Sequence, residues 1–188
     1  WRDVQSILDS IKSRTPGFSD TLPARRNLWG EKIVSEGGLG PDIISPIYTK
    51  SAKKSPVDEY MVANKVEVSM PARAQMGVEL KPEEYWRFVE LAGNGVKEPG
   101  TNMGAKDTLE AIVSGGHPLS SQWDNATDGP EGGRALIIKS VIQGFRQAAQ
   151  AKLLEEFPDL RLRVEERAIE RGGALRETIM NPERGRLQ

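Results

Sequence analysis

The sequence predicts a mainly α-helical protein with several short helices, one long amphipathic helix at about residues 134–157, and little or no β-sheet. Apolar residues recur at helical spacing over residues 134–157, and Pro or Gly residues follow most of the shorter helical stretches. Residues 15–56 differ from the rest, because five prolines and a Gly-rich turn interrupt them. Such a stretch favours a long extended N-terminal arm over regular secondary structure.

The predicted organisation has three parts. Residues 1–14 form a helix at the cut end of a larger chain, because their apolar residues follow helical spacing from the start. Residues 15–56 form the Pro/Gly-rich arm, and residues 57–188 form a helical domain. The arm is richer in apolar residues than a disordered linker, so we expect it to lie along another surface.

The N-terminal part of the helical domain is expected to consist of short helices. Pro82 suits a first helical turn, Glu83 and Glu84 complement the positive end of the helix dipole, and Gly93 to Gly95 stop that helix. The alternating residues 65–70 are a weak strand candidate. The short helices expected are residues 57–63, 82–92, 105–114 and a single turn within 118–126.

Two longer helices complete the prediction. The long helix has the widest apolar stripe in the chain, and its core residues are expected to be Ile138, Val141, Phe145 and Leu153. Pro158 ends this helix, and Asp159 is a plausible cap for a last one. Within that last helix, the three-residue spacing predicts ion pairs of Arg163 with Glu166 and of Arg167 with Glu170.

Composition excludes several classes of site. The chain has no Cys, which rules out a disulfide scaffold, a thiolate zinc site and a cysteine nucleophile. The 26 basic and 27 acidic residues nearly cancel, so nucleic-acid binding would be non-specific. Thirteen of the acidic residues fall within residues 58–131, between mildly basic flanks, which is compatible with complementary surfaces in an assembly. No apolar run is long enough for a transmembrane segment.

Motifs that would indicate catalysis fail on spacing. The glycine clusters match neither a P-loop nor a dinucleotide fingerprint, and the loop from Asp124 lacks the final Glu of a calcium site. His117 is the only histidine, and no carboxylate can be assigned to orient it toward Ser120 or Ser121. Adjacent carboxylates such as Glu83 and Glu84 diverge on a helix. We therefore predict no catalytic, cofactor-binding or metal-binding residues.

The stretch "LPARRNLWGE" is the strongest candidate for an interaction site. Trp29 is expected to insert as an apolar anchor, while Arg25 and Arg26 form charge-assisted hydrogen bonds with carboxylates. Those carboxylates belong either to the acidic middle of this chain or to a neighbouring subunit. An ordinary surface loop with a locally packed tryptophan is an equally open interpretation.

Residues 11–48 also carry a resemblance. The stretch "SIKSRTPGFSDTLPARRNLWGEKI", with "DIISPIYTKS" further on, resembles a segment near the end of very large virion proteins of tailed bacteriophages, notably the internal or ejection proteins of short-tailed phages. The resemblance covers about a fifth of the chain, and it includes no catalytic motif.

The resemblance implies a structural protein of the virion, carried inside the capsid or at the portal and ejected with the genome to help form the DNA-delivery conduit. Implied partners are portal, core or other ejection proteins, together with further copies of the chain. Two alternatives stay open. One is a head–tail connector that remains in the particle, and the other is a non-catalytic part of a virion-associated peptidoglycan hydrolase.

Overall fold

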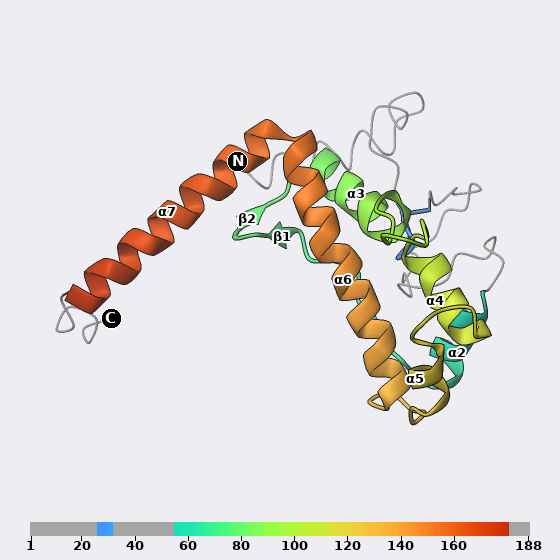
Figure 1. The fold of residues 1–188 in the computed structure, drawn as a ribbon. Helices are drawn as coiled ribbons and strands as arrows, with labels where there is room; N and C mark the ends of the chain where they lie inside the picture. The colour runs from blue at the N-terminus through green and yellow to red at the C-terminus, as the bar shows by residue number, and fades with distance from the viewer. Residues whose placement is uncertain (1–25, 32–54, 181–188) are drawn as a thin grey trace, which may run out of the picture.

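The computed structural model describes residues 26–31 and 55–180, and within this part the protein is mainly helical (Figure 1). This confirms the predicted mainly α-helical character with little β-sheet, and the described sheet is a single two-stranded antiparallel hairpin. The predicted helix over residues 1–14 and most of the arm lie outside the described residues. The elements are α2 (Pro56–Ala63), β1 (Ala74–Gln75), β2 (Val78–Glu79), α3 (Pro82–Glu90), η2 (Leu91–Gly95), α4 (Ala105–Ser114), α5 (Ser120–Asp124), α6 (Gly133–Glu156) and α7 (Pro158–Met180).

Helix α6 is the central element, as its apolar stripe predicts. Its 24 residues pack against two successive hydrophobic clusters, one along each half of the helix. Ile138, Phe145 and Leu153 are buried, whereas Val141 is only partly buried. Burying a side chain of this size contributes on the order of 1.5–3 kcal/mol. The stripe thus contributes buried residues to both clusters.

The first cluster lies between α2, α4, α5 and the first half of α6. Its centre holds Met61, Leu109, Ile112 and Ile138, and it also includes Trp29 from the arm. Helix α2 begins with a capping box, in which Ser55 Oγ accepts from the backbone N–H of Asp58 and the Asp58 carboxylate accepts from the backbone N–H of Ser55. The arm thus contributes two side chains, Leu28 and Trp29, to the first cluster of the helical domain.

The second cluster lies between α3, η2, the second half of α6 and the start of α7. The predicted apolar face of α3 is confirmed, because Tyr85, Phe88 and Val89 are all buried. The helix does not stop at Gly93, however, but continues through Gly95 as a π-helical turn. The extra turn places Leu91 in the second cluster and brings the backbone of Gly93 against the carbonyl group of Trp29.

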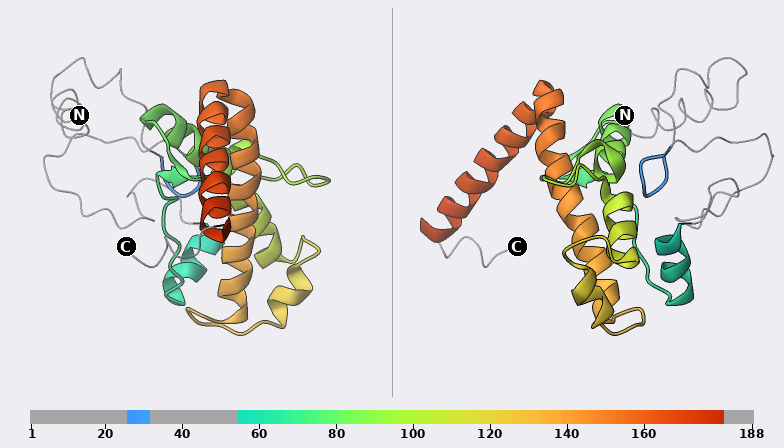
Figure 2. Two further views of the ribbon diagram at one scale, coloured as in Figure 1. Left: turned by 90° about the vertical axis from the view of Figure 1, so that its left-hand side faces the viewer. Right: turned by 45° about the vertical axis from the view of Figure 1, so that its right-hand side comes forward.

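Helix α7 leaves the body at a sharp angle after Phe157, and the β1–β2 hairpin lies in the angle between α6 and α7 (Figures 1 and 2). Leu160 is fully buried in the second cluster and fixes the first turn of α7. The Arg163 guanidinium reaches back to the Glu79 carbonyl and to the buried Glu84 carboxylate, with Nη2 to Oε2 at 2.7 Å. Beyond this contact the helix extends away from the core.

Three local predictions were wrong. Asp159 does not cap α7, because the helix already begins at Pro158. Arg163 pairs with Glu84 rather than with Glu166, since the fold places a buried carboxylate within its reach. Residues 65–70 form no strand, because they pair with no described strand; Val66 and Val68 are instead buried in the first cluster. The predicted pair Arg167–Glu170 is confirmed at 2.8 Å.

Candidate functional site

The 26–31 turn is closed by one side chain. Asn27 Oδ1 accepts hydrogen bonds from the backbone N–H groups of Trp29 and Glu31, both at 3.0 Å, while Asn27 Nδ2 donates to the Glu31 carboxylate. Backbone bonds from Asn27 N to Glu31 O and from Gly30 N to Asn27 O complete the loop. A short asparagine amide suits such a turn because it can replace backbone partners. The turn presents its neighbouring side chains in a defined orientation.

Trp29 is the apolar anchor of the turn. Its side chain is buried in the first cluster, and its indole Nε1 donates a 3.0 Å hydrogen bond to Oδ1 of Asp58. The other carboxylate oxygen of Asp58 accepts from the backbone N–H and the hydroxyl of Ser55. One buried carboxylate therefore both caps α2 and binds the indole of the arm.

Two glycines allow the backbone of the turn to approach the helical body closely. A Cβ atom on Gly93 would collide with the carbonyl group of Trp29, and one on Gly30 would lie 2.9 Å from the Cα atom of Glu90. Gly30 also has a φ of +73°, a conformation that residues with a Cβ atom rarely adopt. Glycine is thus required on both sides of this contact.

Arg26 connects the turn to a chain of ion pairs. Its Nη1 donates to the Gly30 carbonyl at 2.7 Å, and its Nη2 lies 2.9 Å from the Glu90 carboxylate. The same carboxylate binds Arg87, which in turn forms two hydrogen bonds with Glu156 at 2.6 and 2.8 Å. The hydrogen bonds from Arg87 hold the pKa of Glu156 below its ordinary value. The network links the arm to α3 and to the end of α6.

Glu31 provides the last contact of the turn. Its carboxylate lies 3.1 Å from Lys106 Nζ on α4. Partial burial raises the pKa of Glu31, but the hydrogen bonds from Asn27 and Lys106 outweigh that effect and lower it overall. Within residues 26–31, each charged or aromatic side chain therefore contacts the helical body.

The structure brings together two of the three predicted interaction residues. Arg26 and Trp29 meet carboxylates of this chain's acidic middle, whereas Arg25 lies outside the described residues. A contact of this stretch with a neighbouring subunit stays a prediction. Sequence reasoning missed Asn27, Asp58, Glu90 and Gly93. Only Asp58 had a usable local signal, because the spacing Ser55-x-x-Asp58 is that of a capping box.

His117 has a carboxylate partner that sequence spacing could not assign. Its ring Nε2 lies 3.1 Å from the Glu98 carboxylate, while Nδ1 accepts a hydrogen bond from the backbone N–H of Leu119. The Ser120 hydroxyl accepts from the backbone N–H of His117 and donates to the Ala111 carbonyl, so it does not contact the ring. Both ring nitrogens are engaged, and this arrangement is not that of a nucleophile and its base.

The acidic loop before α6 forms hydrogen bonds with α2 and with the start of α6. Asp128 accepts from the Tyr60 hydroxyl at 2.7 Å and from Arg134 at 2.9 Å, and Thr127 Oγ1 accepts from the backbone N–H of Gly133 at the start of α6. Over residues 26–31 and 55–180, no group of three or more His, Asp or Glu side chains is placed to hold a metal ion. In the same ranges, no helix is both long and apolar enough to cross a bilayer.

Comparison of the chain with protein-family models, with curated proteins and with solved structures finds no significant match.

Proposed function

We propose that this chain is an assembly module of a structural virion protein of a tailed bacteriophage, packaged in the particle and ejected with the genome to help form the DNA-delivery conduit. The proposal rests on the contacts of the 26–31 turn with the helical body. This turn contains the central residues of the segment that resembles the phage virion proteins. Arg26, Trp29 and Glu31 all attach the arm to the helical body, which is the role of an architectural motif.

Helix α7 supports an assembly role. It extends about 34 Å, on the basis of its 23 residues and a rise of about 1.5 Å per residue, and it projects from the body (Figure 2). Leu162 and Ile169 are 58% and 74% exposed and lie two helical turns apart on the same face of the helix. Exposed apolar side chains on a projecting helix suit contacts with other virion proteins or with further copies of the chain.

The proposal is tested by following the parent protein through infection. Purified particles are triggered to release their DNA, and the protein is quantified by mass spectrometry in particles before and after release. Depletion of the protein from emptied particles, together with its recovery from the host cell envelope, is the expected result. Complete retention would favour the head–tail connector instead, and absence from purified particles would contradict the proposal.

Variants of α7 test the assembly surface separately. Leu162→Ser with Ile169→Ser is expected to reduce incorporation into particles without changing the melting temperature, since both side chains are largely exposed. Arg167→Ser on the same helix is the control, because it alters an exposed polar position that lies away from the face of Leu162 and Ile169. Equal incorporation of both variants would contradict a role for this apolar face in assembly.

A further inference from the structure

Three arginines near the β1–β2 hairpin differ from the other arginines in their partners. Every other arginine side chain that the structure describes forms an ion pair with a carboxylate. Arg73, Arg146 and Arg171 form no ion pair with any residue in the described ranges. Arg73 directly precedes β1, Arg146 lies on α6 and Arg171 lies on α7, and the hairpin lies in the angle between these two helices (Figures 1 and 2). The unpaired guanidinium groups are therefore all found in one part of the fold.

Arg73 and Arg146 both lie close to Tyr85. The Arg73 guanidinium carbon is 5.7 Å from the centre of the Tyr85 ring, which is a cation–π contact. Burial raises the pKa of Tyr85, and the positive charges of Arg73 and Arg146 oppose that rise. The Tyr85 hydroxyl is neutral at pH 7 and donates to the Pro71 carbonyl at 3.0 Å, so it compensates neither charge. Two guanidinium groups therefore lie near one ring with their charges unpaired within the described residues.

The charge of Arg146 is partly buried. Its Nη2 donates to the Ser69 carbonyl, and burial lowers the pKa of Arg146 below its ordinary value. Removing a charged group from water is costly unless an opposite charge accompanies it, and a guanidinium group has several further N–H donors beyond the one that this contact uses. An anion beside Arg146 would compensate the charge and bind to the remaining donors.

Arg171 extends the positive charge to the tip of the hairpin. A Cβ atom on Gly77 would lie 2.8 Å from Nη2 of Arg171, so this guanidinium lies over the turn between β1 and β2. Arg73 lies at the base of the hairpin, where its carbonyl accepts from the backbone N–H of Leu80. Within residues 68–79, the only acidic residue is Glu79. Positive charge therefore flanks the hairpin from its base to its tip.

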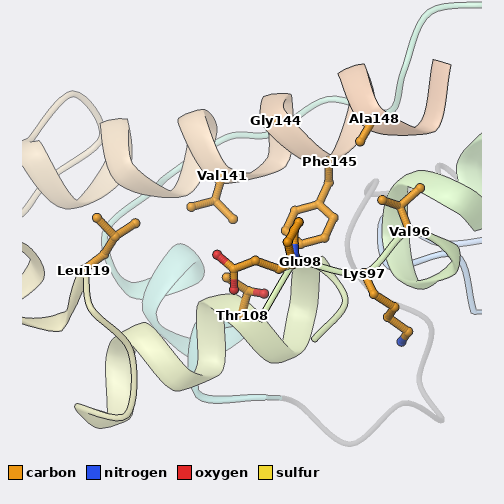
Figure 3. Close-up of a pocket in the computed structure, with 10 residues that line it drawn as sticks. Val96, Lys97, Glu98, Thr108, Leu119, Val141, Gly144, Phe145 and Ala148 are labelled. Atoms are coloured by element: carbon orange, nitrogen blue, oxygen red, sulfur yellow. The ribbon is translucent and has the colours of Figure 1, made fainter. Parts of the chain in front are cut away.

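The cavity between α4 and α6 is a separate feature and does not suit an anion. Val141, Phe145 and Ala148 line this cavity of about 260 Å³ from α6, and the Glu98 carboxylate lies in its wall (Figure 3). With 3.6 residues per helical turn, Arg146 lies about 100° or more from each of these α6 residues around the helix axis. Arg146 therefore faces away from the cavity and toward the segment that leads into the hairpin.

The arrangement of the three guanidinium groups indicates the kind of partner. Guanidinium groups form charge-assisted hydrogen bonds with phosphate and carboxylate oxygens. Arg73 and Arg171 lie at opposite ends of the hairpin, which suits a chain of regularly repeated negative charges better than one small anion. The phosphate backbone of a nucleic acid is such a chain. We infer that the hairpin, with Arg73, Arg146 and Arg171, binds the phosphate backbone of nucleic acid, and because phosphates carry no sequence information, it does so without regard to sequence.

The salt dependence of DNA binding tests the inference. The full chain is titrated into labelled double-stranded DNA of random sequence, and binding is followed by fluorescence anisotropy. Three phosphate contacts predict a slope of about −2.7 for the logarithm of the association constant against the logarithm of the salt concentration. The affinity should therefore fall about 40-fold between 50 and 200 mM salt. No binding at 50 mM salt, or an affinity that does not change with salt, would overturn the inference.

A double variant tests whether these arginines make the contacts. Arg73→Gln with Arg171→Gln should weaken binding and reduce the slope to about −0.9, the contribution of Arg146 alone. Both side chains are exposed, so the fold should be retained, which circular dichroism checks. Arg161→Gln with Arg167→Gln is the matched control, because it removes two exposed arginines of α7 that already have carboxylate partners. Equal losses in the two double variants would attribute binding to overall charge and overturn the site.

Competition distinguishes nucleic acid from other anions. Polyglutamate, at the same concentration of negative charge, and inorganic phosphate are each added to the complex with labelled DNA, and sodium chloride of equal ionic strength is the control. Neither competitor should displace the DNA more than the sodium chloride does. Displacement by polyglutamate as strong as that by unlabelled DNA would identify an acidic protein surface as the partner. Displacement by inorganic phosphate beyond the salt control would identify a site for a single ion, and either result would overturn the assignment to nucleic acid.

Discussion

The indole Nε1 of Trp29 donates a 3.0 Å hydrogen bond to the buried carboxylate of Asp58, which also caps helix α2. This contact connects the arm to the first hydrophobic cluster, and it makes the stability of the helical domain depend on a residue of the arm. Replacing Trp29 should therefore destabilise the whole domain rather than release a surface loop.

Trp29→Ala should lower the free energy of unfolding by about 3–5 kcal/mol, because it removes a large buried side chain. Trp29→Phe keeps a ring but removes the donor to Asp58, and it should cost about 1–3 kcal/mol. Urea unfolding measures both changes. Trp86→Phe is the control, since Trp86 is only partly buried, and it should cost clearly less. Equal losses for the two Trp→Phe variants would contradict a specific role of the indole hydrogen bond.

Gly93→Ala should destabilise the protein even though alanine is the better helix former. The added methyl group would collide with the Trp29 carbonyl and displace the 26–31 turn. Gly144→Ala is the matched control, because its methyl group meets no neighbour, and it should stabilise the protein by about 0.5–1 kcal/mol. Thermal unfolding of the two variants should show opposite signs, and a stabilised Gly93→Ala variant would refute the close approach.

The ion pair of Arg26 with Glu90 should contribute modestly to stability. The Arg26 side chain is only 15% exposed, whereas that of Glu90 is 34% exposed, so the pair is partly screened by solvent. A double-mutant cycle with Arg26→Gln and Glu90→Gln should give a coupling of about 1 kcal/mol. Raising the salt concentration should reduce this coupling. A coupling near zero would show that the turn is held by its other contacts, those of Trp29, Glu31 and the two glycines.

Arg163→Met should be strongly destabilising, because it leaves the buried Glu84 carboxylate without its charged partner. Glu84 is 2% exposed, and breaking a buried pair from one side costs about 3–5 kcal/mol. Arg167→Met is the control, because its pair with Glu170 is exposed, and it should change stability by less than about 1 kcal/mol. Adding Glu84→Leu to Arg163→Met should recover stability, since no buried charge then remains.

Alkaline pH should destabilise the contact of Tyr60 with Asp128. Burial and the hydrogen bond to Asp128 raise the pKa of Tyr60 from 10.0 to about 12. Because the folded-state pKa is the higher one, the stabilisation is fully present below pH 10 and is lost as the pH rises toward about 12.

The melting temperature should therefore fall over this range, and Tyr60→Phe should show a smaller fall. Some alkaline dependence will persist in the variant, because burial also raises the pKa of Tyr85. Identical pH profiles for the wild-type protein and Tyr60→Phe would contradict the assignment to Tyr60.

The amino-acid sequence by itself determined the helices of the domain and most of their ends. Helix α6 was predicted within one residue at each end, because an apolar stripe with a terminal Pro158 is a local signal. The left-handed Gly115 at the end of α4 is another such signal. The β1–β2 hairpin had no comparable signal, because its strands are two residues each and are positioned by α6 and α7.

Only the tertiary structure decided which residues Trp29, Glu31 and Arg163 contact. Trp29 and Asp58 are 29 positions apart, and Glu31 and Lys106 are 75 apart, so neither pair leaves a periodic pattern in the sequence. The partner of Arg163 was mispredicted for the same reason, because the buried Glu84 lies 79 positions away and provides a less solvated carboxylate than the exposed Glu166. Long-range electrostatic contacts are selected by burial, and burial exists only once the helices have packed.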